Sequence, residues 1–368
     1  KDDNSLVNIK NINADTLFFS LQMGMKMNKR PDFKKIEEKL GRLFNKFFIN
    51  ELNVENAGVE VLGDKGLDNN KKELLDFKFS LYELGYSVDD SVKILPEKIY
   101  ISLKENQFLS SNGLYTYKIG DLNYNITTNS FLIDSFEIKP KLNKSDYFKH
   151  FGYQVDRFEV ACGDILGNGL DIDEFIESNT LIINKLEIDS INSEILRDKT
   201  YKFKTGIEKP MPADLPKLIE QAFLIDSLVV SNSKILYGEY VNKSNNPGVV
   251  YFDDFELTAT NITNIESKIL ENNKLKIDFN TSLMGKPKLD AQLDILLDNP
   301  EKFSFRGKTE EMDFGIFNSL TENLFGISII RGNGSFNIDN IISSDSISKG
   351  FITFKYKKLH YMIGIKQN

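Results

Sequence analysis

Few side chains in this sequence are of the types that enzymes use for covalent or acid–base chemistry. The 368 residues contain two histidines, His150 and His360, and one cysteine, Cys162. A histidine can act as the base for a serine nucleophile, but the Gly-x-Ser-x-Gly turn that presents such a serine is absent. A nucleophilic Cys162 would need a neighbouring base and a lowered pKa. We therefore expect packed or surface histidines and a small buried thiol, and we predict that the protein is not an enzyme.

Metal and cofactor sites are equally poorly supported. Residues 167–174 gather oxygen ligands, but the EF-hand spacing and its mid-loop glycine are missing. The alternative is a turn in which Asp171 or Asp173 caps a short helix. Gly332 and Gly334 form a lone Gly-x-Gly without a third glycine, which indicates a tight turn rather than a dinucleotide loop. We expect no metal site and no cofactor.

Composition narrows the class of protein further. Lys and Arg number 46 against 54 Asp and Glu, so the net charge is −8, and nucleic acid is not an expected partner because its binders need a basic surface. Acidic pairs are plentiful, but the separation that glycosidases require cannot be read from sequence. Tryptophan, a common platform for sugars, is absent. A binding or structural protein is favoured over an enzyme.

The dominant hydrophobic period is two, which is typical of β-strands. Apolar and polar residues alternate from 275 to 283 and again from 289 to 297, across a turn at 285–288, and predict a hairpin with one apolar face. That face is expected to be buried. A similar stretch over 352–365 slips out of step near residues 357–358, which predicts a β-bulge. The apolar residues of that hairpin face are Leu275, Ile277, Phe279, Leu289, Ala291, Leu293 and Ile295.

Helices are expected to be few, so the fold class is mostly β. The clearest helix is predicted over 32–48, where an apolar stripe follows a Pro-Asp start signal. A short helix is predicted over 212–222, and single helical turns over 145–151, 172–178 and 314–325. Two regions are expected: a β-rich N-terminal segment over 1–130 that carries the amphipathic helix, and a second region over 131–368 that continues the same sheet.

A diffuse internal repeat accompanies the strand pattern. The stretch 225–237 aligns without a gap on 49–61, and parts of 183–188 and 133–138 repeat its first half. Each copy is interpreted as a strand, a small polar turn at an Asn or Ser, and a return strand. The irregular spacing excludes a tight solenoid and fits a long sheet extended by similar hairpins.

A series of short elements in this order resembles the large AsmA-like proteins of Bacteroidetes-type Gram-negative bacteria, which are related to TamB-like β-groove lipid-transfer proteins. The resemblance covers roughly residues 130–365 and contains no catalytic signature. It departs from the family at 331–334, where Arg-Gly-Asn-Gly stands in place of the usual Ser-Gly. The elements that carry it are 146–153, 181–183, 197–199, the prolines at 210, 212 and 216, 225–239, 248–255, 283–286, 307–313 and 350–359.

The resemblance implies a long antiparallel sheet, curled into an apolar groove that binds phospholipid acyl chains or conducts them between the inner and outer membranes. The seven apolar residues of the hairpin face at 275–295 are then the candidate groove lining, and a dry core is the alternative for them. The resemblance also implies a periplasmic location and an inner-membrane anchor. Because the sequence begins with Lys rather than Met, we expect a trimmed fragment whose anchor lies outside these residues. Two alternatives from other classes remain. One is a periplasmic scaffold for outer-membrane biogenesis with a dry core, and the other is a surface adhesin with an exposed binding site.

Overall fold

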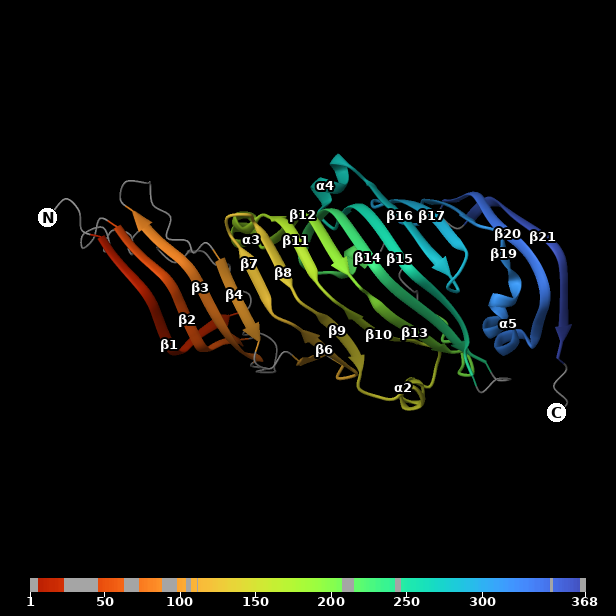
Figure 1. Cartoon of the computed structure of the whole chain (residues 1–368), viewed down its shortest axis with the longest axis horizontal. Coiled ribbons are helices and arrows are strands. Elements are labelled where there is room, and N and C mark those ends of the chain that lie inside the picture. Colours follow the sequence, from red (N-terminus) through yellow and green to blue (C-terminus); the bar gives the residue numbers. More distant parts are fainter. Residues whose placement is uncertain are drawn as a thin grey trace. The chain divides into compact units, whose positions relative to one another are not determined.

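The computed structural model describes residues 6–22, 46–62, 73–87, 98–103, 107–110, 112–206, 215–241, 246–344 and 347–364. Strands dominate these residues, so the prediction of a mostly β fold with a few short helices is confirmed. The chain divides into two compact units (Figure 1). The first comprises 1–107 and 119–134, and the second comprises 108–118 and 135–368. The predicted boundary between the two regions lay at residue 130.

The first unit begins with a parallel strand pair, β1 and β2, whose register runs from Leu6 opposite Lys46 to Gln22 opposite Leu62. The pairs β2–β3, β3–β4, β4–β7 and β7–β8 that follow are antiparallel. Its strands are β1 (Leu6–Gln22), β2 (Lys46–Leu62), β3 (Glu73–Ser87), β4 (Lys98–Leu103), β7 (Leu122–Asn125) and β8 (Ser130–Ile133), and the short β5 (Gln107–Leu109) lies at the division between the units.

The second unit carries the longer strands and the described helices. Its strands are β6 (Tyr115–Ile119), β9 (Phe136–Pro140), β10 (Asp156–Cys162), β11 (Ile165–Leu170), β12 (Thr180–Asp189), β13 (Asn192–Asp198), β14 (Ala222–Tyr240), β15 (Gly248–Thr263), β16 (Lys274–Leu283), β17 (Lys288–Leu296), β18 (Phe303–Thr309), β19 (Met312–Asp313), β20 (Ile327–Ser344) and β21 (Ile347–Ile363). Its helices are α2 (Lys144–Phe151), α3 (Ile172–Ser178), α4 (Glu266–Glu271) and α5 (Asn318–Phe325), with 3-10 turns η1 (Leu215–Leu218) and η2 (Phe314–Phe317).

The strand pairing is mixed, which corrects the expectation of a wholly antiparallel sheet. β12 and β13 lie one after the other along the same side of β14, and both run parallel to it. Parallel neighbours need a long connection, and in the sequence β13 ends at Asp198 and β14 begins at Ala222. From β14 onward the pairs β14–β15, β15–β16, β16–β17, β17–β18, β18–β20 and β20–β21 are all antiparallel.

The predicted hairpin is present as β16 and β17. Leu275 lies opposite Ile295 and Phe279 opposite Ala291, so the apolar residues of both strands share one face. The predicted bulge in the last strand is also present, because the register with β20 shifts beside Lys358, whose φ is 50°.

The internal repeat corresponds to long bulged strands rather than to hairpins. Residues 225–237 lie within β14 and residues 49–61 within β2, and neither stretch reverses direction. Each strand instead shifts register against its antiparallel neighbour, between Val54 and Ala57 in β2 and between Val230 and Ser233 in β14. The polar residues therefore mark β-bulges, which bend a strand without ending it.

The three short helical turns expected near 145–151, 172–178 and 314–325 are present, and Asp171 caps α3 by accepting from the Glu174 amide at 2.9 Å. The predicted helix over 32–48 lies outside the described residues up to 45, and 46–48 belong to β2. Within 212–222 the described part holds only the turn η1 and the start of β14. Gly332 and Gly334 lie inside β20, so the prediction of a turn there is wrong.

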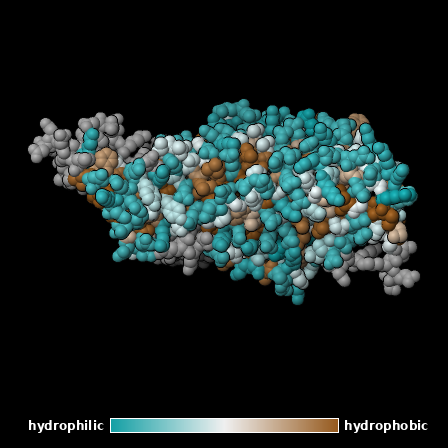
Figure 2. All heavy atoms as spheres, viewed as in Figure 1, coloured by the Kyte–Doolittle hydropathy of each residue, from teal (hydrophilic) through white to brown (hydrophobic). Residues whose placement is uncertain are grey.

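Two apolar clusters form the core of the second unit. Ala259, Leu275, Ile295 and Leu297 pack together, and Ile269 of α4 covers them. Tyr147 and Phe148 of α2 pack against Leu196 of β13 in the other cluster. Most of the surface in view is hydrophilic, whereas hydrophobic residues lie exposed around β20 and β21 (Figure 2).

Candidate functional site

A cavity of about 760 Å³ crosses six strands of the second unit, namely β14 to β18 and β20. Its lining follows one register row, in which each residue lies opposite the next on the adjoining strand. The row is apolar from end to end and is smallest at its fourth and fifth positions. Its members are Val230, Leu257, Phe279, Ala291, Gly307 and Ile338.

On each strand the cavity is bordered by three consecutive residues, of which the middle one belongs to the apolar row and the flanking ones are mostly polar or charged. Successive side chains of a strand point to opposite faces of the sheet, so the flanking side chains do not share the face of the row. Lys308 and Asp290, both flanking residues, form an ion pair at 4.0 Å.

Two of the seven groove residues expected from sequence, Phe279 and Ala291, line this cavity. The ring of Phe279 also stacks on Phe255 of β15 with centroids 5.7 Å apart. The other five do not line it. Leu275 and Ile295 are each only 3 % exposed, with the half-buried Ile277 and Leu293 packed against their cluster, and Leu289 is half-buried near the start of β17. One face of the hairpin thus serves both as a dry core and as part of a cavity.

Sequence reasoning missed the contributions of β14, β15, β18 and β20 to this row. Residues 303–307 and 336–338 do alternate apolar and polar or small positions, so a signal for strands is present. The order of the strands across the sheet is not encoded in that signal. The pairing of β18 with β20, which skips the short β19, brings Ile338 beside Gly307.

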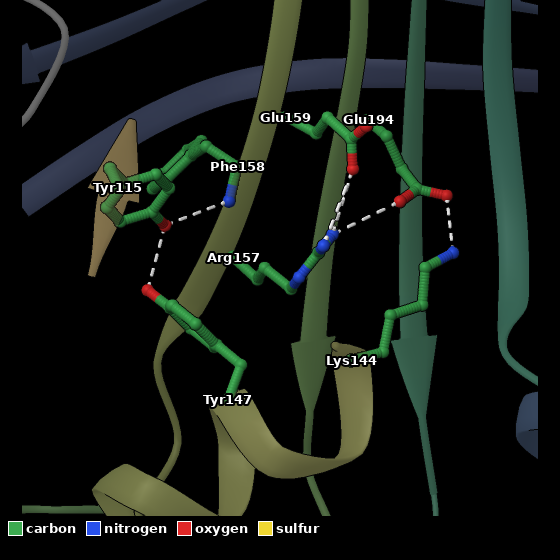
Figure 3. Close-up of polar contacts among 7 residues, drawn as sticks. All are labelled: Tyr115, Lys144, Tyr147, Arg157, Phe158, Glu159 and Glu194. Atoms are coloured by element: carbon green, nitrogen blue, oxygen red, sulfur yellow. Dashed lines mark hydrogen bonds and ion pairs between the residues drawn. The ribbon is translucent and has the colours of Figure 1, made fainter. Parts of the chain in front are cut away.

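A second polar feature surrounds Arg157 on β10 (Figure 3). Its side chain is 6 % exposed, and its Nη1 lies 3.4 Å from a carboxylate oxygen of Glu159 and 3.5 Å from one of Glu194. Lys144, at the start of α2, contacts Glu194 at 2.8 Å. The Nε atom of Arg157 is buried without a partner among the described residues. These ion pairs join α2 to β10 and β13.

A chain of hydroxyl groups lies beside the Arg157 cluster. The Phe158 amide donates to the Tyr115 hydroxyl at 3.2 Å, and the hydroxyls of Tyr115 and Tyr147 are 2.8 Å apart. Tyr147 in turn donates to the Asp156 carbonyl at 3.2 Å. Burial first, and then the bond with Tyr115, raise the pKa of Tyr147 far above its ordinary value. A phenol that stays protonated and fully bonded is a structural group rather than an acid–base catalyst.

The residues weighed for covalent chemistry have no activating surroundings among the described residues. Burial raises the pKa of the Cys162 thiol, which lowers the fraction of reactive thiolate. The His150 ring packs edge-on against Phe151 with centroids 5.3 Å apart, and His360 lies against the Arg331 guanidinium at 3.1–3.2 Å. None of the three side chains contacts a serine or carboxylate partner of a catalytic type in the part of the chain that is described.

Among the residues that the structure describes, no group of three or more His, Cys, Asp or Glu side chains is placed to hold a metal ion. No described helix is long and apolar enough to cross a membrane.

Comparison with known proteins gives no assignment: no protein-family model matches the chain, and no curated protein matches it in sequence.

Proposed function

We propose that this protein binds the acyl chains of phospholipids along the cavity row of its second unit and acts by binding rather than by catalysis. The observation that carries the proposal is the continuous apolar row across six strands at a cavity of about 760 Å³. That volume falls within the roughly 300–1,000 Å³ of ligand pockets in general. Transfer of an acyl chain from water to such a row is favourable by about 0.8 kcal/mol per CH₂ group.

The resemblance to AsmA-like proteins supports a phospholipid over a plain hydrocarbon as the ligand. On the same ground we propose a periplasmic location and an anchor in the inner membrane, with lipid passed toward the outer membrane.

A second candidate function is a periplasmic scaffold for outer-membrane biogenesis. The dry cluster around Leu275 and Ile295 favours it, because these side chains leave no space for a ligand. The two functions differ in what they require of the cavity, since a scaffold does not depend on Phe279 or Ile338.

The deciding experiment is native mass spectrometry after incubation with vesicles of phosphatidylethanolamine and phosphatidylglycerol. The lipid-binding proposal expects one or more phospholipids per chain. Phe279→Ser and Ile338→Asn should each reduce this loading at least tenfold, because they introduce polar groups into the row. Ile295→Ala is the matched control, because it removes apolar volume from the dry cluster and leaves the cavity lining intact.

The outcomes separate the two candidates. Folded protein that takes up no lipid would overturn the acyl-chain proposal and favour the scaffold. Equal loss of loading in Ile295→Ala and Phe279→Ser would also contradict it, because the loss would then follow stability rather than the cavity.

A further inference from the structure

The last strand of the second unit, β21, has one neighbour among the described residues. It pairs with β20 from Ile327 opposite Ile363 to Ser344 opposite Ile347, and the structure assigns no described strand to its other side. An edge strand of 17 residues presents a row of N–H and C=O groups that a further strand can pair with. Natural sheets normally keep their edge strands short, cover them or bend them away.

β21 is also the most exposed apolar part of the described chain. Phe351 is 78 % exposed, and Ile352, Tyr356 and Ile363 are each more than half exposed. Exposed side chains occur on both faces of the strand, because Phe351 and Ile352 are adjacent and point to opposite sides. Contiguous apolar surface of this kind marks an interaction site more often than it marks ordinary surface.

The charge of β21 is opposite to that of the chain. The strand holds Lys349, Lys355, Lys357 and Lys358 and no Asp or Glu, whereas the whole chain has a net charge of −8. Only Lys357 has an ion pair with a described residue, to Glu311 at 3.6 Å. The edge is therefore a local basic stripe with apolar side chains between its cations.

We propose that β21 is a docking edge for an acidic, extended segment of another protein, which adds to the sheet as a further strand. Backbone pairing supplies the affinity, the lysines select acidic side chains, and the exposed apolar residues pack against alternate positions of the added strand. This inference is independent of the lipid-binding proposal, because β21 contributes no residue to the cavity lining.

Two other occupants fit the edge less well. A lipid surface would bury the aromatic residues but leave the edge backbone groups unpaired in an apolar medium, at a cost of several kcal/mol each. A second copy pairing through β21 would set lysines against lysines, and β1 of a second copy offers only one acidic residue, Asp15, beside Lys10. Charge and backbone pairing together favour an acidic strand.

The test uses hydrogen–deuterium exchange of the whole chain with a blocked twelve-residue peptide of alternating Glu and Val. The expected result is slowed exchange at residues 347–363. An acidic peptide of the same charge with Pro at every third position should give no protection, because proline cannot donate to the ladder. Lys349→Glu combined with Lys355→Glu should weaken binding at least tenfold. Lys276→Glu combined with Lys286→Glu, which changes net charge equally away from β21, should not.

Several results would overturn the proposal. Protection of a different strand, or of none, by the acidic peptide is one such result. Equal binding of the proline peptide is another, because it would leave only non-specific charge attraction. Protection of β21 by anionic vesicles without protection by the peptide would assign the edge to a membrane surface. A concentration-dependent dimer that is abolished by the Lys349→Glu and Lys355→Glu changes would assign it to a second copy.

Discussion

Asn232 and Asp189 are joined across two parallel strands: the Asn232 side-chain amide donates to the Asp189 carboxylate at 2.7 Å. Asn232 lies at the bulge of β14 with a φ of 50°, and Asp189 is the last residue of β12. The Ser231 hydroxyl donates to the same carboxylate at 2.9 Å, and the Ser190 hydroxyl at 2.5 Å. One carboxylate therefore holds together the bulge of β14 and the end of the neighbouring strand β12.

The first unit has a related contact at the corresponding positions. Asn56, at the bulge of β2, donates from its side chain to the Asp15 backbone carbonyl of β1 at 2.7 Å. Both units therefore contain a parallel strand, a bulged strand and an antiparallel strand in the same order. In both, an Asn side chain at the bend bonds to the Asp beside it, to the carboxylate of Asp189 but to the backbone carbonyl of Asp15. The sequence repeat between 49–61 and 225–237 is the trace of this shared arrangement.

Replacement of Asn232 tests how much the bond contributes. Asn232→Ala loses the hydrogen bond and places a less tolerant residue in the left-handed region, and we expect a loss of about 1–2 kcal/mol of unfolding free energy. Asn232→Gly keeps the backbone conformation at no steric cost and should lose less. Urea denaturation of both variants measures the difference. Equal losses would show that backbone strain plays no part.

Asp189 makes part of the stability depend on pH. Hydrogen bonds from Ser190, Asn232 and Ser231 hold the pKa of its carboxyl below the ordinary value. Because the folded pKa is the lower one, the contribution is fully present above the unfolded pKa of about 4 and is lost as pH falls through the folded value. Denaturant midpoints of the wild type and Asp189→Asn, measured from pH 7 to pH 3, should converge on acidification. A constant gap would exclude a role for the charge.

The fold class could be predicted because alternation of apolar and polar residues is a local signal. β16 and β17 show it without interruption, and Asp171 heads a helix by the ordinary capping rule. Whether a strand turns back or continues through a bulge was harder to predict. A polar Asn between two apolar runs indicates a turn or a bulge equally well. Only the continuous pairing of β14 with β15, whose register shifts between Val230 and Ser233, decides for the bulge.

The candidate site was only partly predictable for the same reason. Phe279 and Ala291 were found because they lie on the apolar face of a strong hairpin. Gly307 and Ile338 were not, because a residue's place in the cavity row depends on which strand pairs with which. The alternation of apolar and polar residues also could not distinguish Leu275 and Ile295, which lie in the dry cluster, from Phe279, which lines the cavity. All three are apolar residues on one face.

Loss of the positive charge of the Arg157 cluster should lower the free energy of unfolding less than loss of its two negative charges. Arg157 is buried, whereas Glu159 and Glu194 keep 41 % and 29 % of their side-chain surface in solvent. Arg157→Met leaves carboxylates that water can hydrate, so we expect a change within about 1 kcal/mol. Glu159→Gln combined with Glu194→Gln leaves a buried guanidinium without a counter-ion and should cost about 2–4 kcal/mol.

Guanidinium chloride would screen these charges, so the unfolding free energies are best measured in urea at low salt. The single variant Lys144→Met is a control, because it removes an exposed cation from Glu194 and should cost well under 1 kcal/mol. The reverse order, with Arg157→Met the most destabilised, would show that the favourable contacts of the guanidinium outweigh the cost of burying its charge.

Gly334 is a position in β20 where a side chain cannot fit. A Cβ there would overlap the Lys355 carbonyl oxygen of β21 and lie 2.5 Å from the Phe314 ring. Gly334→Ala must therefore push β21 away from β20, and we expect a loss of about 1–3 kcal/mol or more, together with faster amide exchange in both strands. Gly163→Ala is the matched control. Its Cβ would lie 3.6 Å from the Asp189 carbonyl oxygen, an ordinary contact, so its stability should change by no more than about 1 kcal/mol. Unchanged exchange in β20 and β21 of Gly334→Ala would show that the two strands do not approach each other this closely, which would also remove the basis for treating β21 as a fixed edge.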